Sequence, residues 1–133
     1  SSFVGMVGLK NIFELTLSSK SDILWMANKK MSDQIFQGYY WHNYAQKRID
    51  KKIPIRLIIE PTKKTDWDTD KKVWRETKRN DLISDLDASF VLFDDNIVTY
   101  SLEKEKLFGV FIKNKAIKKS FEKIFNRLWS ESK

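Results

Sequence analysis

Two short apolar runs, separated by a helical stretch, constrain the fold of this chain more than any other feature. Residues 23–27 contain no charged side chain, and residues 55–59 contain only Arg56. Runs this short, flanked by turn residues or proline, are typical of strands buried on both faces of a sheet. Because helical spacing fills the segment between them, we expect parallel neighbours joined by a right-handed crossover.

Apolar residues at helical spacing predict helices around these strands. Residues 7–19 form one amphipathic pattern, and Asn114 can cap another that closes the chain. Ser32 and Asp33 are suitable N-caps for a long middle helix, which we expect to reach about residue 51 and to end before Pro54. The apolar faces of the first and last helices comprise Leu9, Ile12, Phe13, Leu17, Ile117, Phe121, Ile124, Phe125 and Leu128.

The later part of the chain predicts more strands. Residues 89–93 and 97–101 are strand-like, and Asp94-Asp95-Asn96 between them is typical of a hairpin turn. Residues 107–112 predict another strand, while residues 71–78 fit either a short helix or a strand. The chain therefore predicts a single α/β domain over residues 1–133, with a mixed sheet flanked by helices. Its order is α-β-α-β-β-β-β-α, with the variable segment between the strand at residues 55–59 and the strand at residues 89–93.

Composition restricts the chemistry of the protein. The absence of cysteine excludes disulfides, thiolate zinc sites and a cysteine nucleophile. It fits a reducing compartment, so we expect a cytoplasmic protein, although many secreted proteins also lack cysteine. No apolar run approaches the roughly 18–20 residues that a membrane span needs, and residues 1–10 lack the pattern of a signal peptide.

The net charge of +7 has two interpretations. It can reflect a lysine-rich composition with solvated basic faces, or it can serve nucleic acid, an anionic membrane surface or an acidic partner. Basic residues gather near the end of the middle helix and on the last helix, whose phenylalanines fall on the apolar face. The clusters comprise Lys47, Arg48, Lys51, Lys52, Lys113, Lys115, Lys118, Lys119 and Lys123.

Tests for catalytic and metal-binding patterns are negative. His42 is the only histidine, and it lies in the middle of a predicted helix, far from any nucleophile pattern. Asp66, Asp68 and Asp70 have the spacing that opens a calcium loop, but Lys71 and Thr77 stand where that loop needs glycine and glutamate. No phosphate-loop or dinucleotide pattern occurs. We therefore predict no metal and no cofactor.

Aromatic residues are abundant, and they fit either the core or a ligand pocket. Rings with a polar tip suit sugars and other amphipathic small ligands, although most aromatics in a small domain simply build its core. The candidates are Trp25, Tyr39, Tyr40, Trp41, Trp67 and Trp74.

Four segments carry a resemblance that covers nearly the whole chain. They read VGLKNIFE at residues 7–14, WHNYAQKRI at 41–49, IRLII at 55–59 and FIKNKAIKKSF at 111–121, closing at Leu128-Trp129. In order and spacing they resemble the C-terminal effector domains of archaeal and bacterial TrmB-type transcription regulators. The resemblance implies a fold like half of a phospholipase D.

Active members of the phospholipase D superfamily carry H-x-K, with an aspartate five residues after the lysine. The resemblance places Asp87 at the histidine, Ser89 at the lysine and Asp94 at the aspartate. A carboxylate and a hydroxyl replace neither the imidazole nucleophile nor the phosphate-binding ammonium, and a carboxylate repels a phosphodiester. The resemblance therefore implies a protein that is not an enzyme.

What the resemblance implies about function is a non-catalytic ligand-sensing and dimerisation domain of a transcription regulator. Relatives sense a small-molecule effector, often a sugar, form homodimers and reach DNA through a winged helix-turn-helix domain. That domain is absent from this sequence, so we expect an isolated effector fragment or a protein without the DNA reader. The alternative is a degenerate phospholipase-like module whose basic faces bind nucleic acid or anionic lipid. The candidate ligand-binding residues are Trp25, Asn28, Tyr40, Arg56, Asp87 and Ser89.

Overall fold

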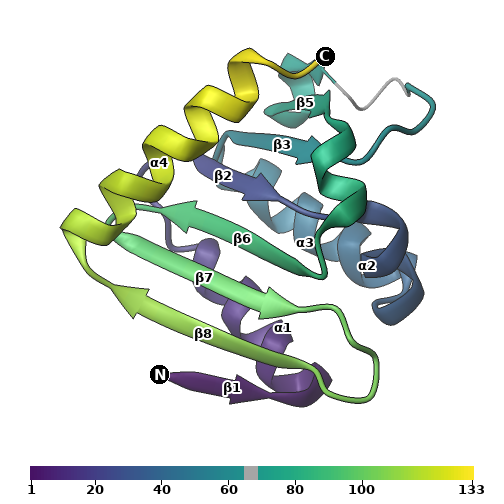
Figure 1. The fold of residues 1–133 in the computed structure, drawn as a ribbon, viewed down its shortest axis with the longest axis vertical. Helices are drawn as coiled ribbons and strands as arrows, with labels where there is room; N and C mark the ends of the chain where they lie inside the picture. Colours follow the sequence, from purple (N-terminus) through teal and green to yellow (C-terminus); the bar gives the residue numbers. More distant parts are fainter. Residues whose placement is uncertain (65–68) are drawn as a thin grey trace.

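The computed structural model describes residues 1–64 and 69–133. Within these residues the chain folds into one mixed sheet with helices on both faces (Figure 1). The elements are β1 (Ser2–Val4), α1 (Gly5–Thr16), β2 (Ile23–Met26), α2 (Lys29–Ile35), α3 (Gly38–Asp50), β3 (Ile55–Ile59), β4 (Thr69–Asp70), the 3-10 helix η1 (Lys71–Val73), β5 (Arg75–Arg79), the 3-10 helix η2 (Asp81–Asp85), β6 (Ala88–Phe93), β7 (Asn96–Ser101), β8 (Phe108–Lys113) and α4 (Lys115–Ser130).

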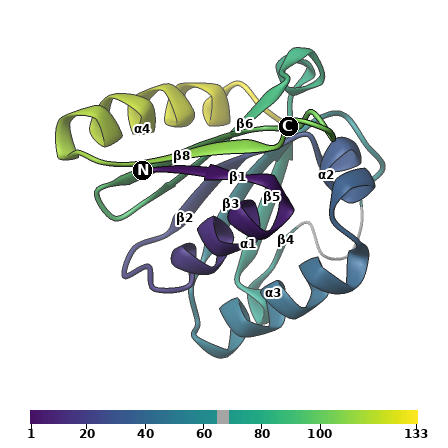
Figure 2. The same cartoon turned by 90° about the horizontal axis from the view of Figure 1, so that it is seen from below.

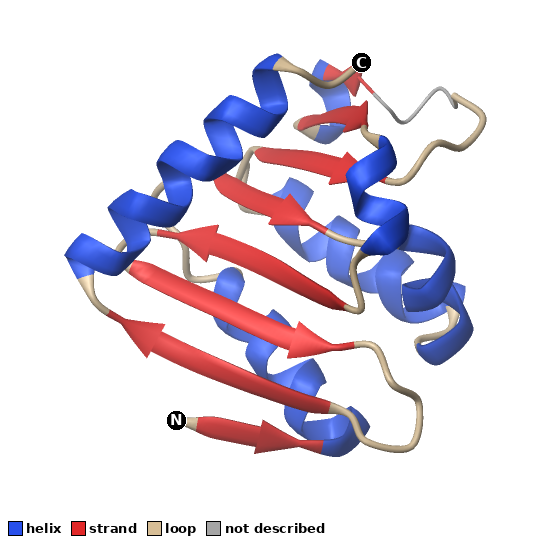
Figure 3. Ribbon diagram, in the orientation of Figure 1, coloured by secondary structure: helices blue, strands red, loops and turns tan. Residues whose placement is uncertain are grey.

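The sheet has the strand order β1-β8-β7-β6-β2-β3-β5-β4. The predicted parallel pairing of the first two apolar runs is confirmed, because β2 and β3 are parallel neighbours. The β3–β5 pair is also parallel, and β2 pairs antiparallel with β6 on its other side. The hairpin of β6 and β7 is confirmed too, with Asp94 and Asp95 in its turn. Figure 3 shows this change from parallel to antiparallel pairing at the middle of the sheet.

Helices α1, α2 and α3 cover one face of the sheet, and α4 lies across the other (Figure 2). The strand β2 is buried on both faces, because Trp25 enters the core beneath α1–α3 while Leu24 and Met26 enter the core beneath α4. This arrangement confirms the mixed α/β architecture predicted from the sequence. Asn114 caps α4 as expected, since its side-chain oxygen accepts the Ile117 amide at 3.0 Å.

The prediction of one long middle helix was wrong. Two helices, α2 and α3, replace it, and the chain is extended at Phe36 between them. Phe36 is fully buried, with its ring 5.3 Å from that of Phe13, so burial of this ring determines where the helix breaks. The cap of α2 is Asn28, which accepts the Met31 amide, and not Ser32 or Asp33, which lie inside the helix.

Other boundaries differ in smaller ways. Helix α1 spans Gly5–Thr16, two residues earlier at its start than expected, and it follows a strand, β1, that the sequence pattern does not predict. Strand β8 is not an edge, because β1 pairs with it. The ambiguous segment contains both alternatives, since η1 is followed by β5.

Candidate functional site

The face of the sheet beneath α1–α3 carries a dense cluster of aromatic rings. Trp25 on β2 contacts rings from α1 and α3, with centroids 5.5 Å from Phe13, 5.8 Å from Trp41 and 5.9 Å from Tyr44. Its indole Nε1 donates to the hydroxyl of Tyr100 on β7 at 2.9 Å. The parallel strand β2 thus brings together rings that are far apart in the sequence.

A cavity of about 120 Å³ lies within this cluster. It is bounded by α2 and α3 on one side and by β2, β3 and β5 on the other. Most of its lining residues are aromatic or aliphatic, and the others are polar or charged. The residues that matter for recognition are Trp25, Ser32, Trp41, Tyr44, Arg75 and Tyr100.

Two polar atoms on the lining residues are buried without a partner. The indole Nε1 of Trp41 and the hydroxyl of Ser32 make no hydrogen bond to any residue that the structure describes. Buried polar groups are normally satisfied, and each exception calls for an explanation.

The tyrosines of the cluster are held neutral. Burial raises the pKa of Tyr100 to about 12 and raises the pKa of Tyr44 well above its usual range. The hydroxyls of Ser32 and Ser89 lie near enough to Tyr100 to lower its pKa slightly, yet neither reaches hydrogen-bonding geometry with a described residue. The Tyr44 hydroxyl shares a short hydrogen bond with Thr16. Around neutral pH the rings are therefore hydrogen-bonding groups and not anions.

Arg48 fixes the wall of the cavity between α3 and β5. Only 2% of its surface is exposed, and its guanidinium donates to the carbonyls of Ile53, Trp74 and Val73 at 2.9–3.0 Å. Burial, together with a smaller effect of the neighbouring charge of Arg75, lowers the pKa of Arg48 to about 10. Arg48 remains charged at neutral pH and holds the start of β5 beside α3.

Of the candidates chosen from the sequence, the structure places Trp25 on the cavity. Asn28 caps α2 and is not among the residues that line the cavity. Tyr40 packs against the aromatic core, and the Lys10 ammonium lies 5.0 Å from its ring centroid. Arg56 lies on the opposite face of the sheet, with its guanidinium carbon 5.7 Å from the ring centroid of Phe125 and 5.5 Å from that of Trp129.

The remaining two candidates lie at the start of β6. Asp87 is exposed, whereas Ser89 is fully buried beside Tyr100. Asp94, which corresponds to the catalytic aspartate in the resemblance, occupies the hairpin turn, where its carboxylate accepts the Lys20 amide at 3.0 Å. His42 is exposed on α3. Asp87 and Asp94 therefore flank opposite ends of β6.

Sequence reasoning missed Ser32, Tyr44 and Arg75 as candidates. Trp41, Tyr44 and Arg48 share one face of α3, and this helical spacing is a signal that could have identified Tyr44. Arg75 gives no such signal, because its place on the cavity depends on the pairing of β5 with β3.

Two further expectations concern ions and membranes. Asp66, Trp67 and Asp68 lie outside the described residues, as does the side chain of Tyr39, so the structure does not describe the calcium-like spacing. Among the residues that are described, no group of three or more acidic, histidine or cysteine side chains could hold a metal. None of the described helices is long and apolar enough to cross a membrane.

Comparison of the structure with solved structures identifies the fold. The phospholipase D family member Nuc from Salmonella typhimurium matches 100% of this chain and 96% of its own, with a TM-score of 0.64 and 12% identity. NucT from Helicobacter pylori matches 99% of this chain and 96% of its own, with a TM-score of 0.64 and 7% identity. This chain has a phospholipase D-like fold.

The same fold relates the chain to TrmB-type proteins. The structure of TrmBL2, described as an archaeal chromatin protein with a novel mode of DNA binding, covers all of this chain with a TM-score of 0.70 and 14% identity. The phospholipase D-like chain spans 52% of the length of that TrmBL2 chain. No family model matches the sequence, and no curated protein matches it significantly.

Proposed function

We propose that this phospholipase D-like chain is a non-catalytic, ligand-sensing domain of a transcription regulator. The observation that carries the proposal is the aromatic cavity with two unpartnered polar atoms, Trp41 Nε1 and Ser32 Oγ. If this cluster were only a structural core, a version with the space filled and these atoms paired would be more stable than the one observed. The cavity is therefore a binding site for a small molecule.

The loss of catalysis is part of this proposal. Ser89 is buried and carries no positive charge, and exposed Asp87 presents a carboxylate where a phosphodiester would need a nucleophile. His42 is exposed on α3 and does not belong to β6. We expect no hydrolysis of bis(p-nitrophenyl) phosphate above the blank, and turnover that is lost in Asp87→Asn or His42→Ala would contradict this proposal.

The sensing mechanism is a population shift. A ligand that enters between α2, α3 and the sheet stabilises one position of these helices relative to the strands. In a homodimer, that preference would change the arrangement of two subunits and so the DNA affinity of a domain carried elsewhere. Analytical ultracentrifugation tests the homodimer: we expect the sedimentation coefficient of a dimer, and a change in that coefficient when ligand is added.

The binding part is tested by a thermal-shift screen of small molecules. A compound that binds the native cavity raises the melting temperature in proportion to its occupancy. We expect hits whose stabilisation is reduced in Trp41→Phe, which retains a ring but loses the indole donor. Hits that stabilise the wild type and Trp41→Phe equally, with none that discriminate, would argue against this cavity as the site.

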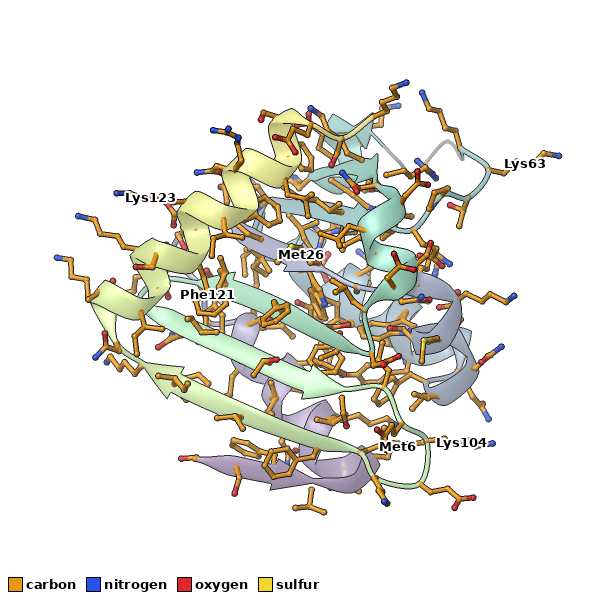
Figure 4. All side chains as sticks on the ribbon, viewed as in Figure 1. Met6, Met26, Lys63, Lys104, Phe121 and Lys123 are labelled. Carbon is orange, nitrogen blue, oxygen red and sulfur yellow. The ribbon has the colours of Figure 1, made fainter. Side chains whose placement is uncertain are left out.

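A second candidate function is nucleic-acid binding through α4. Its outer face exposes Lys119, Lys123 and Arg127, and Figure 4 shows Lys123 extending from the helix into solvent. Binding that depends on phosphate contacts weakens steeply as salt rises. Lys119→Gln/Lys123→Gln should then reduce both the affinity for duplex DNA and its salt dependence, whereas ligand binding in the cavity should not change.

A further inference from the structure

The charged residues that the structure describes on the wall of the aromatic cavity are each engaged by other groups of the protein. Lys29 and Asp33 form an ion pair at 2.6 Å. Arg48 donates to three backbone carbonyls, and Arg75 Nε donates to the hydroxyl of Thr77 at 3.0 Å. A charged ligand would have to displace one of these contacts to gain a counter-charge, and burying a charge without one is costly. The wall therefore favours an uncharged ligand.

Three buried hydroxyl groups gather where β6 and β7 meet α2. Tyr100 and Ser32 line the cavity, and Ser89 lies beside them on β6. Burial dominates the pKa of Tyr100, but the hydroxyls of Ser89 and Ser32 are both near enough to lower it. Ser32 is 5% exposed, Tyr100 2% and Ser89 0%. The cavity thus has an uncharged polar region, shielded from solvent, beside its aromatic rings.

The Tyr100 hydroxyl has a proton to donate. The indole Nε1 of Trp25 donates to the Tyr100 oxygen at 2.9 Å, and an indole N–H is a donor only, so this bond does not use the phenolic hydrogen. Neither serine accepts that hydrogen, because Ser32 Oγ and Ser89 Oγ have no hydrogen-bond partner among the described residues. Buried donors normally have an acceptor. What this region lacks is an acceptor atom.

We propose that the ligand of this domain is a small, flat, uncharged ring compound with one acceptor oxygen, such as an amide carbonyl or a hydroxyl. Its ring lies against Trp25 and Trp41, and its oxygen accepts from the hydroxyls of Tyr100 and Ser32. This inference rests on the proposed sensing function and names the chemical class of its ligand.

The size of the cavity sets the ring. Its volume of about 120 Å³ is near the ~150 Å³ of an engineered cavity that binds benzene. The rings of Trp25, Trp41 and Tyr44 and the aliphatic side chains of Ile55 and Leu57 form much of its lining, which suits a flat apolar body.

The polar groups of the lining set the number of oxygens. Among the described lining residues, Trp41 Nε1 and Ser32 Oγ have no partner, and Tyr100 has one proton to donate. The several hydroxyls of a sugar ring would outnumber these groups, and each buried hydroxyl without a partner weakens binding. The expected sugar is therefore narrowed to a less polar ring.

Calorimetric titration with five probes tests the ligand class. Benzamide and phenol carry a ring and an uncharged oxygen, toluene carries only the ring, benzoate carries the ring and a charge, and glucose is a polar ring. We expect benzamide or phenol to bind about tenfold or more tightly than each of the other three. Benzamide and benzoate have nearly the same shape, so their comparison isolates the charge, and the comparison with toluene isolates the oxygen.

Ser32→Ala locates the oxygen. It should weaken binding of benzamide or phenol by about fivefold and leave toluene unchanged. The melting temperature of the unliganded protein should not fall, because the substitution removes a buried hydroxyl that has no partner among the described residues. Ser120→Ala, at an exposed position on α4, is the matched control and should leave binding unchanged.

Ala45→Leu locates the ring. Ala45 on α3 lines the cavity, so a leucine there fills the space that the ring would occupy. Binding of benzamide and phenol should be lost, while the melting temperature should be kept or raised because a void is filled. Ala116→Leu, at an exposed position on α4, makes the same change elsewhere and should leave binding intact.

Three results would overturn the inference. If toluene binds as tightly as benzamide and phenol, and Ser32→Ala behaves like Ser120→Ala, the oxygen is not recognised, although the cavity still binds a ring. If benzoate or glucose binds most tightly, the ligand is charged or is a polar ring. If no probe binds while the thermal-shift screen gives hits that depend on Trp41, the ligand belongs to another class and the sensing function stands.

Discussion

At the scale of single residues, Arg48 shows how a buried charged group can connect two segments of the chain through hydrogen bonds. Its guanidinium supplies donors to three backbone carbonyls that lie on two separate segments, Ile53 on one side and Val73 and Trp74 on the other. Without it, these carbonyls would lose partners in a largely buried place. The sequence places Arg48 in a basic cluster, but only the fold shows that it faces inward.

Arg48→Leu should therefore destabilise the protein strongly. We expect a loss of about 3 kcal/mol in the free energy of unfolding, because buried acceptors lose their donor. Urea denaturation measures this loss. Arg127→Leu is the control, since the Arg127 side chain is 82% exposed and its ion pair with Glu131 contributes little. Equal effects of the two substitutions would refute the role assigned to Arg48.

The buried tyrosines predict how stability depends on alkaline pH. The folded-state pKa of Tyr100 is about 12, above the ordinary value of 10.0, so above pH 10 the folded state holds a proton that the unfolded state releases. The contribution of Tyr100 to the free energy of unfolding is then fully present below pH 10 and is lost as the pH rises toward 12. The expected slope is about 1.4 kcal/mol per pH unit for each such tyrosine.

Urea denaturation at several pH values above 9 measures this slope, and Tyr100→Phe should reduce it relative to the wild type. The part of the tyrosinate absorbance that Tyr100→Phe removes should rise together with unfolding and not before it. Ionisation of Tyr100 in the folded protein near pH 10 would contradict the burial described for this ring.

At the scale of elements, the packing of α1 on β8 depends on a missing side chain. A Cβ atom at Gly109 would lie 2.7 Å from Ile12 Cδ1 and 2.8 Å from Leu9 Cδ2. These two side chains must shift to admit it, so α1 and β8 would pack less well.

Gly109→Ala should cost about 1–3 kcal/mol in the free energy of unfolding, and Ile12→Val in the same chain should recover part of the loss. Gly38→Ala is the matched control, because a Cβ atom there meets nothing within 4 Å. Thermal denaturation of the three variants measures these differences in stability. A Gly109→Ala protein as stable as the Gly38→Ala protein would show that α1 can shift on β8 without loss of stability.

The elements also show what a sequence pattern can and cannot predict. Strands β2 and β3 were predictable because both faces are buried and their side chains are almost wholly apolar. Strand β5 was ambiguous because it reads Arg-Glu-Thr-Lys-Arg and only Thr77 in it is buried. The break at Phe36 was missed because it follows from the packing of one ring against α1, which no local pattern encodes.

At the scale of the whole molecule, the phospholipase D-like fold was predictable from the order of its segments, whereas the site was not. The cavity needs β2, α2, α3 and β5 in their three-dimensional arrangement, and β5 enters only through its pairing with β3. Among the residues chosen from the sequence, Trp25 lines the cavity, while Arg56 lies on the face covered by α4.

The two faces of the sheet give this account an internal comparison. Trp25 and Trp41 line the cavity beneath α2 and α3, and Trp129 stacks on Phe125 on the other face, with ring centroids 5.8 Å apart. A ligand in the cavity should perturb the first two indoles and not the third. No change in secondary structure is required for this difference.

Nuclear magnetic resonance of the indole N–H groups, during titration with the hits of the thermal-shift screen, tests the central claim most directly. We predict that at least one compound shifts the Trp41 and Trp25 signals saturably, moves the Trp41 proton toward a hydrogen-bonded value and leaves Trp129 unchanged. Saturable binding that shifts Trp129 and leaves Trp41 in place would contradict the account, as would a complete lack of saturable shifts at Trp41.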